Sequence, residues 1–307
     1  MLQLHGSQPC ETVIGRWFPI DRIGRIMTIE RTFDAMPATQ RGLTWIASYP
    51  KSGNTWIRFM ACNLLFGRQR SASTLNSLAP DLHEVGRSIL QAPVPALLKT
   101  HFRLSPQLPL LNHTVAAIYV VRHPMDVAMS NFFYAQRRDP TSGTSTAALD
   151  RYIDTFIECR GDPRWIQIGL GSWEENVRSW FDTPTKFAVL RLHYEDVVRS
   201  PAAACRAIAS LLNQDRSEAE LSQVVSDCSF ERMREIERSD IAERRVGIFY
   251  KPYLQASIDA GHRFMRQGSV GDGARCLNAK QRARMQRAFE PLLTTLGYCA
   301  ETAGTAT

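Results

Sequence analysis

One short loop combines the residue types that bind a phosphate. It spans residues 50–56 (PKSGNTW) and follows the apolar run 43–49. A loop between a strand and a helix aims several backbone N–H groups at one point, and the helix dipole adds positive potential there. A glycine lets the backbone approach a ligand closely, whereas an ordinary turn with a surface lysine is the plainer alternative. The candidate ligand-binding residues of this loop are Lys51, Ser52, Gly53, Asn54, Thr55 and Trp56.

Other polar residues follow apolar runs further along the chain. Lys99 and His101 end one run, Arg122 ends the next with Ser130 eight residues later, and Tyr194 follows another. The carboxyl ends of parallel strands meet at one edge of a sheet, where open α/β sheets bind ligands. We therefore expect these groups to converge on the first loop. A histidine with an ordinary pKa of ~6.5 suits proton transfer near neutral pH.

The elements that must position these residues alternate between strand and helix. Short apolar runs predict strands, and apolar residues at helical spacing predict helices between them. This alternation is typical of an α/β domain with a central parallel sheet flanked by helices. We interpret residues 138–147 as a surface loop and the polar residues 234–272 as a mobile flap. The expected strands are 43–49, 95–100, 114–121 and 187–192, and the expected helices are 55–66, 124–136 and 202–212.

Composition and charge narrow the class of ligand. The chain has 307 residues, of which 44% are hydrophobic and 22% charged, as in an ordinary globular protein. Its net charge of +7 is dispersed, and the basic residues within 280–287 spread around a helix. Dispersed charge favours a small anion over a nucleic acid. We expect an extension at residues 1–40, one domain at 41–300 and a tail at 301–307.

The cysteines and the hydropathy of the sequence indicate the cellular compartment in which the protein is expected. The seven cysteines are odd in number and form no CxxC pair, which argues against a disulfide framework or a zinc site. No apolar run approaches the ~20 residues that cross a bilayer, and no signal-peptide core is visible. We therefore expect a cytoplasmic protein without a membrane span.

Two of these segments resemble motifs of the sulfotransferases that use 3′-phosphoadenylyl sulfate (PAPS). Residues 49–56 resemble the loop that binds the 5′-phosphosulfate group, with Asn54 where the family usually has threonine. The loop differs from a Walker A motif, in which the lysine follows the second glycine. Residues 121–130 resemble the segment whose arginine and serine, here Arg122 and Ser130, bind the 3′-phosphate.

Further segments extend the resemblance over about residues 44–298. Residues 99–101 are similar to the family's K-x-H, which carries the general base, and 171–173 and 194–196 match other landmarks. Residues 264–272 resemble the family's R-K-G-x-x-G-D, although glutamine replaces the lysine and Gly273 replaces a tryptophan. The resemblance implies further donor-binding residues: Tyr194, Cys228 (for the usual threonine), Phe230, Arg266, Gln267 and Gly268.

The resemblance implies a P-loop-kinase-like sulfotransferase fold in a soluble, cytosolic-type, bacterial-looking member of the family. It implies in-line transfer of a sulfuryl group from PAPS to an acceptor hydroxyl or amine, with 3′,5′-bisphosphoadenosine (PAP) as product and no metal. His101 would be the general base, and Lys51 would stabilise the leaving oxygen. Lys99 would lie beside the sulfuryl group, while Ser130 would bind the 3′-phosphate and restrain Lys51 until acceptor arrives.

Two other functions stay open on the sequence. A P-loop nucleotide kinase or NTPase shares the fold plan, but no Walker A motif is present and Asp196 is the nearest candidate for a Mg²⁺ ligand. A relative that binds nucleotide without catalysis is the second, because Gln267 and Gly273 depart from the family pattern.

The expected acceptor is a small molecule: a natural product, lipid, sugar or phenol. We expect no nucleic-acid partner, and the oligomeric state is left open. Segments 78–95, 131–170 and 234–264 are the expected walls of the acceptor pocket. Their aromatic residues indicate either an apolar pocket or core: Phe132, Phe133, Tyr134, Trp165, Phe249, Tyr250 and Tyr253.

Overall fold

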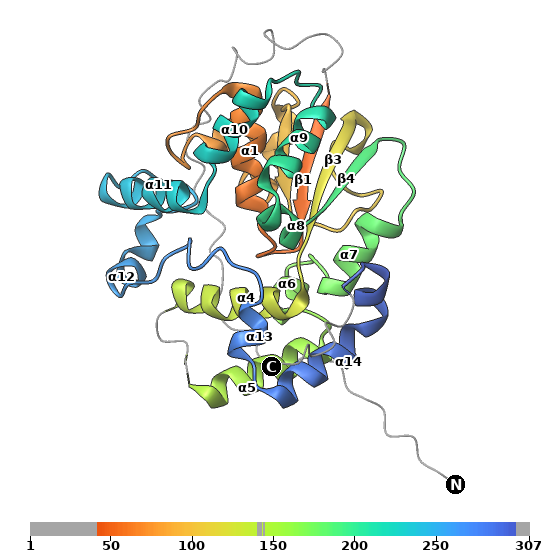
Figure 1. The fold of residues 1–307 in the computed structure, drawn as a ribbon, viewed down its shortest axis with the longest axis vertical. Helices are drawn as coiled ribbons and strands as arrows, with labels where there is room; N and C mark the ends of the chain where they lie inside the picture. Colours follow the sequence, from red (N-terminus) through yellow and green to blue (C-terminus); the bar gives the residue numbers. More distant parts are fainter. Residues whose placement is uncertain (1–41, 140–142, 144, 299–307) are drawn as a thin grey trace.

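A four-stranded parallel sheet forms the centre of the molecule (Figure 1). We describe residues 42–139, 143 and 145–298 of a computed structural model. The strand order is β2-β1-β3-β4, and every neighbouring pair is parallel. The chain leaves β1 for one neighbour and later returns to its other side. The carboxyl end of β1 is therefore a topological switch point, where α/β sheets bind ligands. The strands are β1 Leu43–Ser48, β2 Leu97–Thr100, β3 Thr114–Val121 and β4 Ala188–His193.

Alternating residues of the strands face two separate cores. Trp45 and Tyr119 belong to one core with residues of α4, α5, α7 and α14, whereas Ile46 and Ile118 belong to the other with residues of α1, α9, α10 and α11. A strand that is buried on both faces reads as a continuous apolar run, as β1 and β3 do. The long helices are α1 Asn54–Phe66, α4 Pro124–Arg138, α5 Thr146–Glu158, α7 Trp173–Asp182, α9 Pro201–Leu211, α10 Glu218–Asp227, α11 Phe230–Ala242 and α14 Ala279–Thr295.

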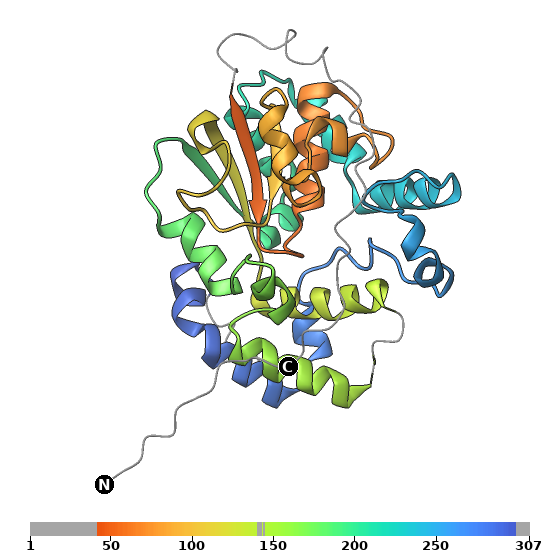
Figure 2. The same cartoon turned by 180° about the vertical axis from the view of Figure 1, so that it is seen from behind.

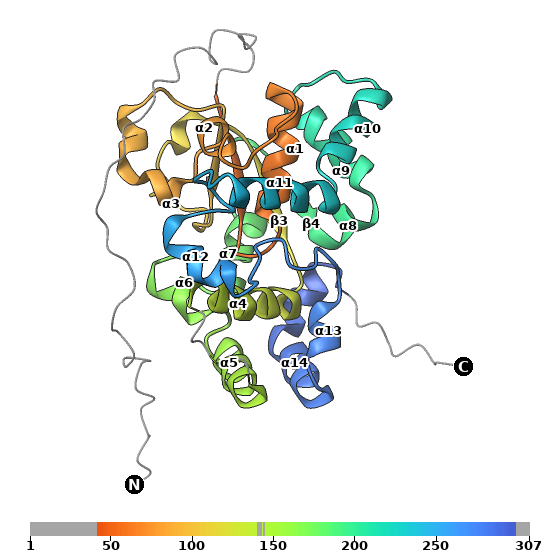
Figure 3. The ribbon, with the colours of Figure 1, turned by 90° about the vertical axis from the view of Figure 1, so that its left-hand side faces the viewer.

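Helices beyond the carboxyl ends of the strands close the lower part of the molecule in Figure 1. α4 starts three residues after β3 ends, and α5 and α14 lie side by side below it (Figures 2 and 3). α11 extends to one side of the sheet, and α12 follows it (Figure 1). The short elements are α2 Leu75–Leu78, α3 Leu82–Val85, η2 Gly86–Gln91, η3 Leu111–His113, α6 Pro163–Gln167, α8 Tyr194–Arg199, η4 Pro252–Leu254, α12 Gln255–Asp259 and α13 Asp272–Cys276.

The predicted α/β class with a central parallel sheet is confirmed, and the four expected strands agree with β1 to β4 to within two residues at each end. The interpretation of 234–272 as a flap is wrong at its start, because 234–242 lie in α11, and α12 lies within the rest. The expected extension 1–40 and tail 301–307 lie outside the described residues, as do parts of the expected loop 138–147.

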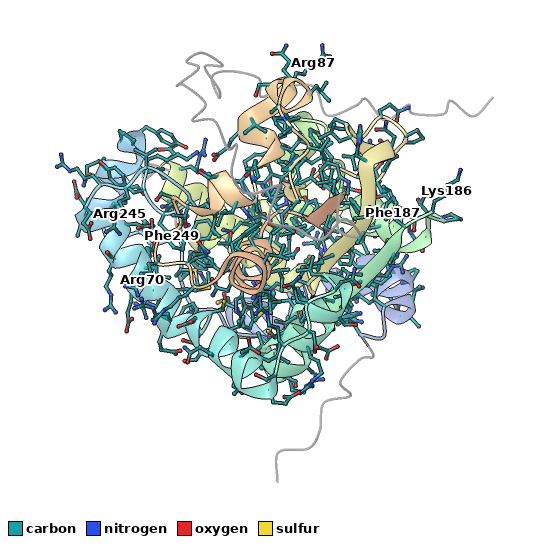
Figure 4. All side chains as sticks on the ribbon, turned by 90° about the horizontal axis from the view of Figure 1, so that it is seen from above. Arg70, Arg87, Lys186, Phe187, Arg245 and Phe249 are labelled. Carbon is teal, nitrogen blue, oxygen red and sulfur yellow. The ribbon has the colours of Figure 1, made fainter. Side chains whose placement is uncertain are left out.

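Basic side chains are spread around the outline of the molecule. Arg70, Arg87, Lys186 and Arg245 stand at separate places on the periphery when the molecule is seen from above (Figure 4). These four side chains do not form one basic strip. In the described ranges, no helix combines the length and apolar character needed to cross a membrane.

Candidate functional site

The loop after β1 is shaped to bring backbone N–H groups together. Lys51 and Gly53 both have left-handed backbone conformations, with φ of 71° and 100°. α1 begins at Asn54, and the N–H groups of Asn54 and Thr55 have no hydrogen-bond partner among the described residues, whereas that of Trp56 donates to the Gly53 carbonyl at 3.0 Å. Such alternating conformations form concave anion sites. Gly53 is required here, because a Cβ would lie 2.5 Å from the ring of Tyr194.

Two side chains of the loop behave differently from each other. The Ser52 hydroxyl is buried and has no hydrogen-bond partner among the described residues, so an acceptor oxygen from a ligand would satisfy it. Asn54 Nδ2 instead donates to the Ile46 carbonyl at 3.0 Å and to Ser48 Oγ at 3.3 Å. The Asn54 amide, expected as a donor to the ligand, therefore ties the loop to β1.

Lys51 projects between two aromatic rings. Its Nζ lies 4.3 Å from the ring centroids of both Tyr134 and Phe264. Burial lowers the pKa of Lys51 to about 7, and the neighbouring Arg137 and Arg122 lower it further. Cation–π contacts hold the ammonium, but no carboxylate pairs with it in the described part of the chain. An anionic ligand would therefore favour the charged form of Lys51.

Lys51 lines a cavity of about 270 Å³ whose walls carry several cationic side chains. One wall is a face of α4, and the opposite wall is the segment 261–266 with Arg234 of α11. The lining includes no aspartate or glutamate, so its electrostatic potential favours anions. Of the residues predicted from the sequence, Lys51, Ser130 and Arg266 meet here. The cationic lining residues are Lys51, Arg137, Arg234, Arg263 and Arg266.

Arg122 lies at the base of the site rather than on the cavity wall. Its Nη2 donates to Asp126 at 3.2 Å and to the Ser269 carbonyl at 2.9 Å. Asp126 also accepts the backbone N–H groups of Gly271 and Gly273, at 3.0 and 2.7 Å. These bonds fasten the segment 269–273 to α4. The Arg122 Nε is buried and has no hydrogen-bond partner among the described residues, so its N–H remains available to a ligand.

The segment 266–268 joins this arrangement. Arg266 forms an ion pair with Asp272, and its guanidinium lies 4.3 Å from the ring centroid of Phe133. In the orientation in which both the nitrogen and the oxygen of its side-chain amide have hydrogen-bond partners, Gln267 donates to the same aspartate at 2.8 Å. Gly268 packs on Phe230, whose ring leaves no room for a Cβ. The predicted residues of this segment are thus brought together with Phe230.

Two residues predicted to bind the donor, Tyr194 and Cys228, lie in different surroundings. Tyr194 packs against Gly53 and edge-on to Trp56, with the Arg122 guanidinium 4.2 Å from its ring centroid. The structure therefore brings these residues of three elements together. Cys228 is fully buried, and its sulfur accepts from Asn63 at 3.2 Å, so it faces the core.

His101 is held in one orientation at the end of β2. Its Nδ1 lies 2.7 Å from the Ser48 carbonyl, which can only accept, so Nδ1 carries the proton and Nε2 keeps its lone pair. Burial, reinforced by Lys99 and His83, lowers the pKa of His101 well below its usual value. The imidazole is therefore neutral near pH 7, which is the state that a general base needs.

Lys99 is engaged in a buried ion pair. Its Nζ lies 2.7 Å from Asp81 Oδ2, and both side chains are largely buried. The charge expected beside the transferred group is therefore balanced by a carboxylate in this structure. Asp81 was missed by the sequence reasoning, because it stands 18 positions earlier in a segment without a motif.

Two further arginines were also missed as site residues. Arg137 was not among the candidates, although it stands seven positions after Ser130 and therefore on the same face of a helix. Arg234 stands four positions after Phe230, which gives a similar signal.

Of the aromatic residues considered for the acceptor pocket, Phe133 and Tyr134 line the cavity, whereas Phe132 and Phe249 belong to the cores. No cluster of three or more His, Cys, Asp or Glu suited to a metal ion occurs in the described residues.

Known proteins resemble this chain over most of its length. Residues 42–297 match the family model of the sulfotransferase domain. Rabbit (Oryctolagus cuniculus) sulfotransferase 1C2 is 26% identical over 303 residues, covering 92% of this chain and 91% of that protein. Rabbit amine sulfotransferase is also 26% identical, over 257 residues, with coverages of 80% and 79%.

Solved structures share the fold. Mouse sulfotransferase SULT7A1 complexed with PAP superimposes with a TM-score of 0.60 at 21% identity, covering 87% of this chain and 90% of that one. Retinol dehydratase in complex with androsterone and inactive cofactor PAP gives a TM-score of 0.56 at 17% identity, with coverages of 86% and 82%.

Proposed function

We propose that this chain, which belongs to the PAPS-dependent sulfotransferase family, transfers the sulfuryl group of PAPS to a hydroxyl or amine of a small molecule. His101 is the proposed general base. The observation that carries the proposal is the cavity where Lys51 of the first loop meets Ser130 and Arg266. We propose residues 41–300 as the catalytic domain, which the match over 42–297 supports.

The residues around the cavity fit a nucleotide that carries two separate anionic groups. Lys51, the loop N–H groups and the Ser52 hydroxyl would hold the 5′-phosphosulfate, since the hydroxyl lacks a partner. Ser130, Arg122 and Arg266 would hold the 3′-phosphate, at the other end of the donor. A second phosphate site separates such a donor from ATP. Trp56 and Phe230 would contact the adenine, as in the family pattern.

The His101 imidazole would take the proton of the acceptor. Nε2, with its free lone pair, accepts that proton as the acceptor oxygen or nitrogen bonds to sulfur. The bond from sulfur to the 5′-phosphate oxygen breaks at the same time, and the leaving PAP keeps the electron pair. Lys51 would face the charge that develops on this oxygen. The protein thus contributes positioning and fixed charge, as in phosphoryl transfer.

The direct test follows label from [³⁵S]PAPS to a panel of phenols, alcohols, sugars, lipids and amines. Labelled acceptor together with PAP is the expected result. Calorimetry with PAP and with ATP–Mg²⁺ separates the alternatives. Tighter binding of ATP–Mg²⁺ than of PAP would contradict the donor assignment. Binding of PAP without transfer to any acceptor would favour a non-catalytic relative.

Arg122→Ala is expected to weaken PAP binding by about 10- to 100-fold, the range for a hydrogen bond to a charged group. Binding of adenosine 5′-phosphate, which lacks the 3′-phosphate, should change little. Calorimetry with both nucleotides measures the difference. Because Asp126 loses an ion-pair partner, the thermal midpoint must be recorded for the same sample. Equal losses for the two nucleotides would remove Arg122 from the 3′-phosphate site.

PAP binding is expected to weaken as the pH rises from about 7.5 to about 9.5. With its pKa lowered to about 7, Lys51 is largely neutral in the free protein above that pH. A bound anion raises this pKa, so binding takes up a proton, and the phosphates are already ionised because their second pKa is ~6. Calorimetry in buffers of different ionisation enthalpy measures the uptake, which Lys51→Met should abolish. A pH-independent affinity without proton uptake would contradict the prediction.

A further inference from the structure

We propose that the natural acceptor carries a carboxylate or similar oxyanion beside the sulfated group, and that Arg137 binds it. This inference rests on the proposed function and concerns the acceptor side of the same site. It starts from a buried cation that forms no ion pair with any residue that the structure describes.

Arg137 is almost completely buried, with 3% of its surface exposed. Its Nη2 donates to the Phe249 carbonyl at 2.7 Å, and its Nε has no hydrogen-bond partner in the described part of the chain. Among the described residues, no carboxylate forms an ion pair with it. The nearby Glu237 carboxylate instead accepts the N–H groups of Phe264 and Met265, at 2.6 and 3.0 Å. A buried charge without a counter-ion is unfavourable, so an anionic ligand would stabilise this arrangement.

The position of Arg137 on α4 separates it from the donor. Ser130, Tyr134 and Arg137 lie on one helix face and all line the cavity. At 1.5 Å per residue, Arg137 is about 10 Å along the helix from Ser130. Lys51 contacts Tyr134, between the two.

This order distinguishes an acceptor contact from a donor contact. If Ser130 binds the 3′-phosphate and Lys51 the sulfated end, the donor lies between them. Arg137 then lies beyond the sulfuryl group, on the side from which the acceptor must approach in an in-line transfer. An aromatic ring lies close to Arg137, as expected of such a pocket, since the guanidinium is 5.5 Å from the Phe264 ring centroid. Figure 4 shows Phe249, whose carbonyl orients Arg137, inward of Arg245.

An arginine in this setting selects by charge and geometry. Its planar fork matches two oxygens of a carboxylate, sulfate or phosphate group. A neutral acceptor of the same shape would leave the guanidinium unpaired. We therefore expect a carboxylate-bearing acceptor to be used about 10- to 100-fold more efficiently than its methyl ester, the range for one hydrogen bond to a charged group.

The test compares matched acceptors in one enzyme preparation. The pairs are 4-hydroxybenzoate with methyl 4-hydroxybenzoate, and 4-(hydroxymethyl)benzoate with its methyl ester. The readouts are kcat/KM with [³⁵S]PAPS and PAP affinity by calorimetry. In the wild type the carboxylates should be preferred. Arg137→Gln, which can still donate to the Phe249 carbonyl, should bring the ratio close to one and should not weaken PAP binding. Because the ratio is internal, a partly unfolded sample does not affect it.

Arg138→Gln is the matched control, since its guanidinium contacts Tyr253. It should keep the preference for carboxylates. Equal use of acid and ester by the wild type, loss of the preference in both variants, or weakened PAP binding in Arg137→Gln would each overturn the inference. Failure to transfer sulfate to any acceptor in the wider panel, with PAP still bound, would instead remove the proposed function, and this inference with it.

Discussion

His101→Ala is expected to lower kcat by about 10²-fold or more, the usual contribution of a general base. The physical reason is the fixed orientation of the ring. Nδ1 is occupied by the Ser48 carbonyl, so Nε2 is the only ring nitrogen with a lone pair for the acceptor proton. His101→Asn is the sharper variant, because its amide can still donate to Ser48 while it lacks a base. Both variants should bind PAP normally.

The pH dependence gives a second readout for His101. Burial lowers its pKa well below 6.5, so the base stays neutral as the pH falls from 8 to 6.5. In this range kcat should not decline because of His101. His83→Ala serves as the control for loss of a neighbouring imidazole, since the His83 ring stacks on His101 and accepts the His101 backbone N–H. Turnover close to the wild type in His101→Asn, at equal PAP affinity, would show that another group takes the proton.

The sheet was predictable because burial on both faces leaves a simple pattern. Thr114–Val121 is an uninterrupted apolar, β-prone run, and β3 spans the same residues. α11 was not predicted, because only one narrow face of it is buried. Met233 and Ile236 are its buried apolar residues, while the other buried positions, Glu237 and Asp240, are acidic. A helix that buries charged residues does not show the apolar period on which the prediction depends.

Much of the candidate site was predictable from the order of strands and loops, since strand ends converge in a parallel sheet. The partners of individual side chains were not. Lys99 pairs with Asp81, Asn54 turns back to β1, and Cys228 contacts Asn63 in the core. Each pairing is decided by packing between segments that are distant in sequence. A motif gives the identity of a residue at a strand end, but not the direction in which its polar atoms find partners.

Gly273 illustrates the same limit. At this position the family usually has tryptophan, and the change kept open a relative that binds nucleotide without catalysis. In the structure, a Cβ on Gly273 would lie 2.5 Å from Met125 Cβ, and the glycine N–H donates to Asp126. The close contact between α13 and α4 therefore requires glycine. The departure from the family pattern is therefore explained by packing between these two helices, and this explanation does not require that PAPS binding has been lost.

Lys51→Met is expected to lower kcat by about 10²- to 10³-fold, the range for loss of one group that stabilises developing charge. Methionine keeps the unbranched chain and can lie between the rings of Tyr134 and Phe264. The variant should fold at least as stably as the wild type, because the lowered pKa of Lys51 means that burial disfavours its charge. Lys186→Met, on the outer surface (Figure 4), is the matched control.

Single-turnover measurements separate the role of Lys51 in the chemical step from its role in binding. With the donor saturating, the rate of label transfer should remain low in Lys51→Met, because the charge on the leaving oxygen develops only as the bond to sulfur breaks. A variant that regains the wild-type rate at saturating PAPS would show that Lys51 contributes to donor binding alone. In that case the stabilisation of the leaving group would have to come from the backbone N–H groups at the start of α1, which the substitution leaves in place.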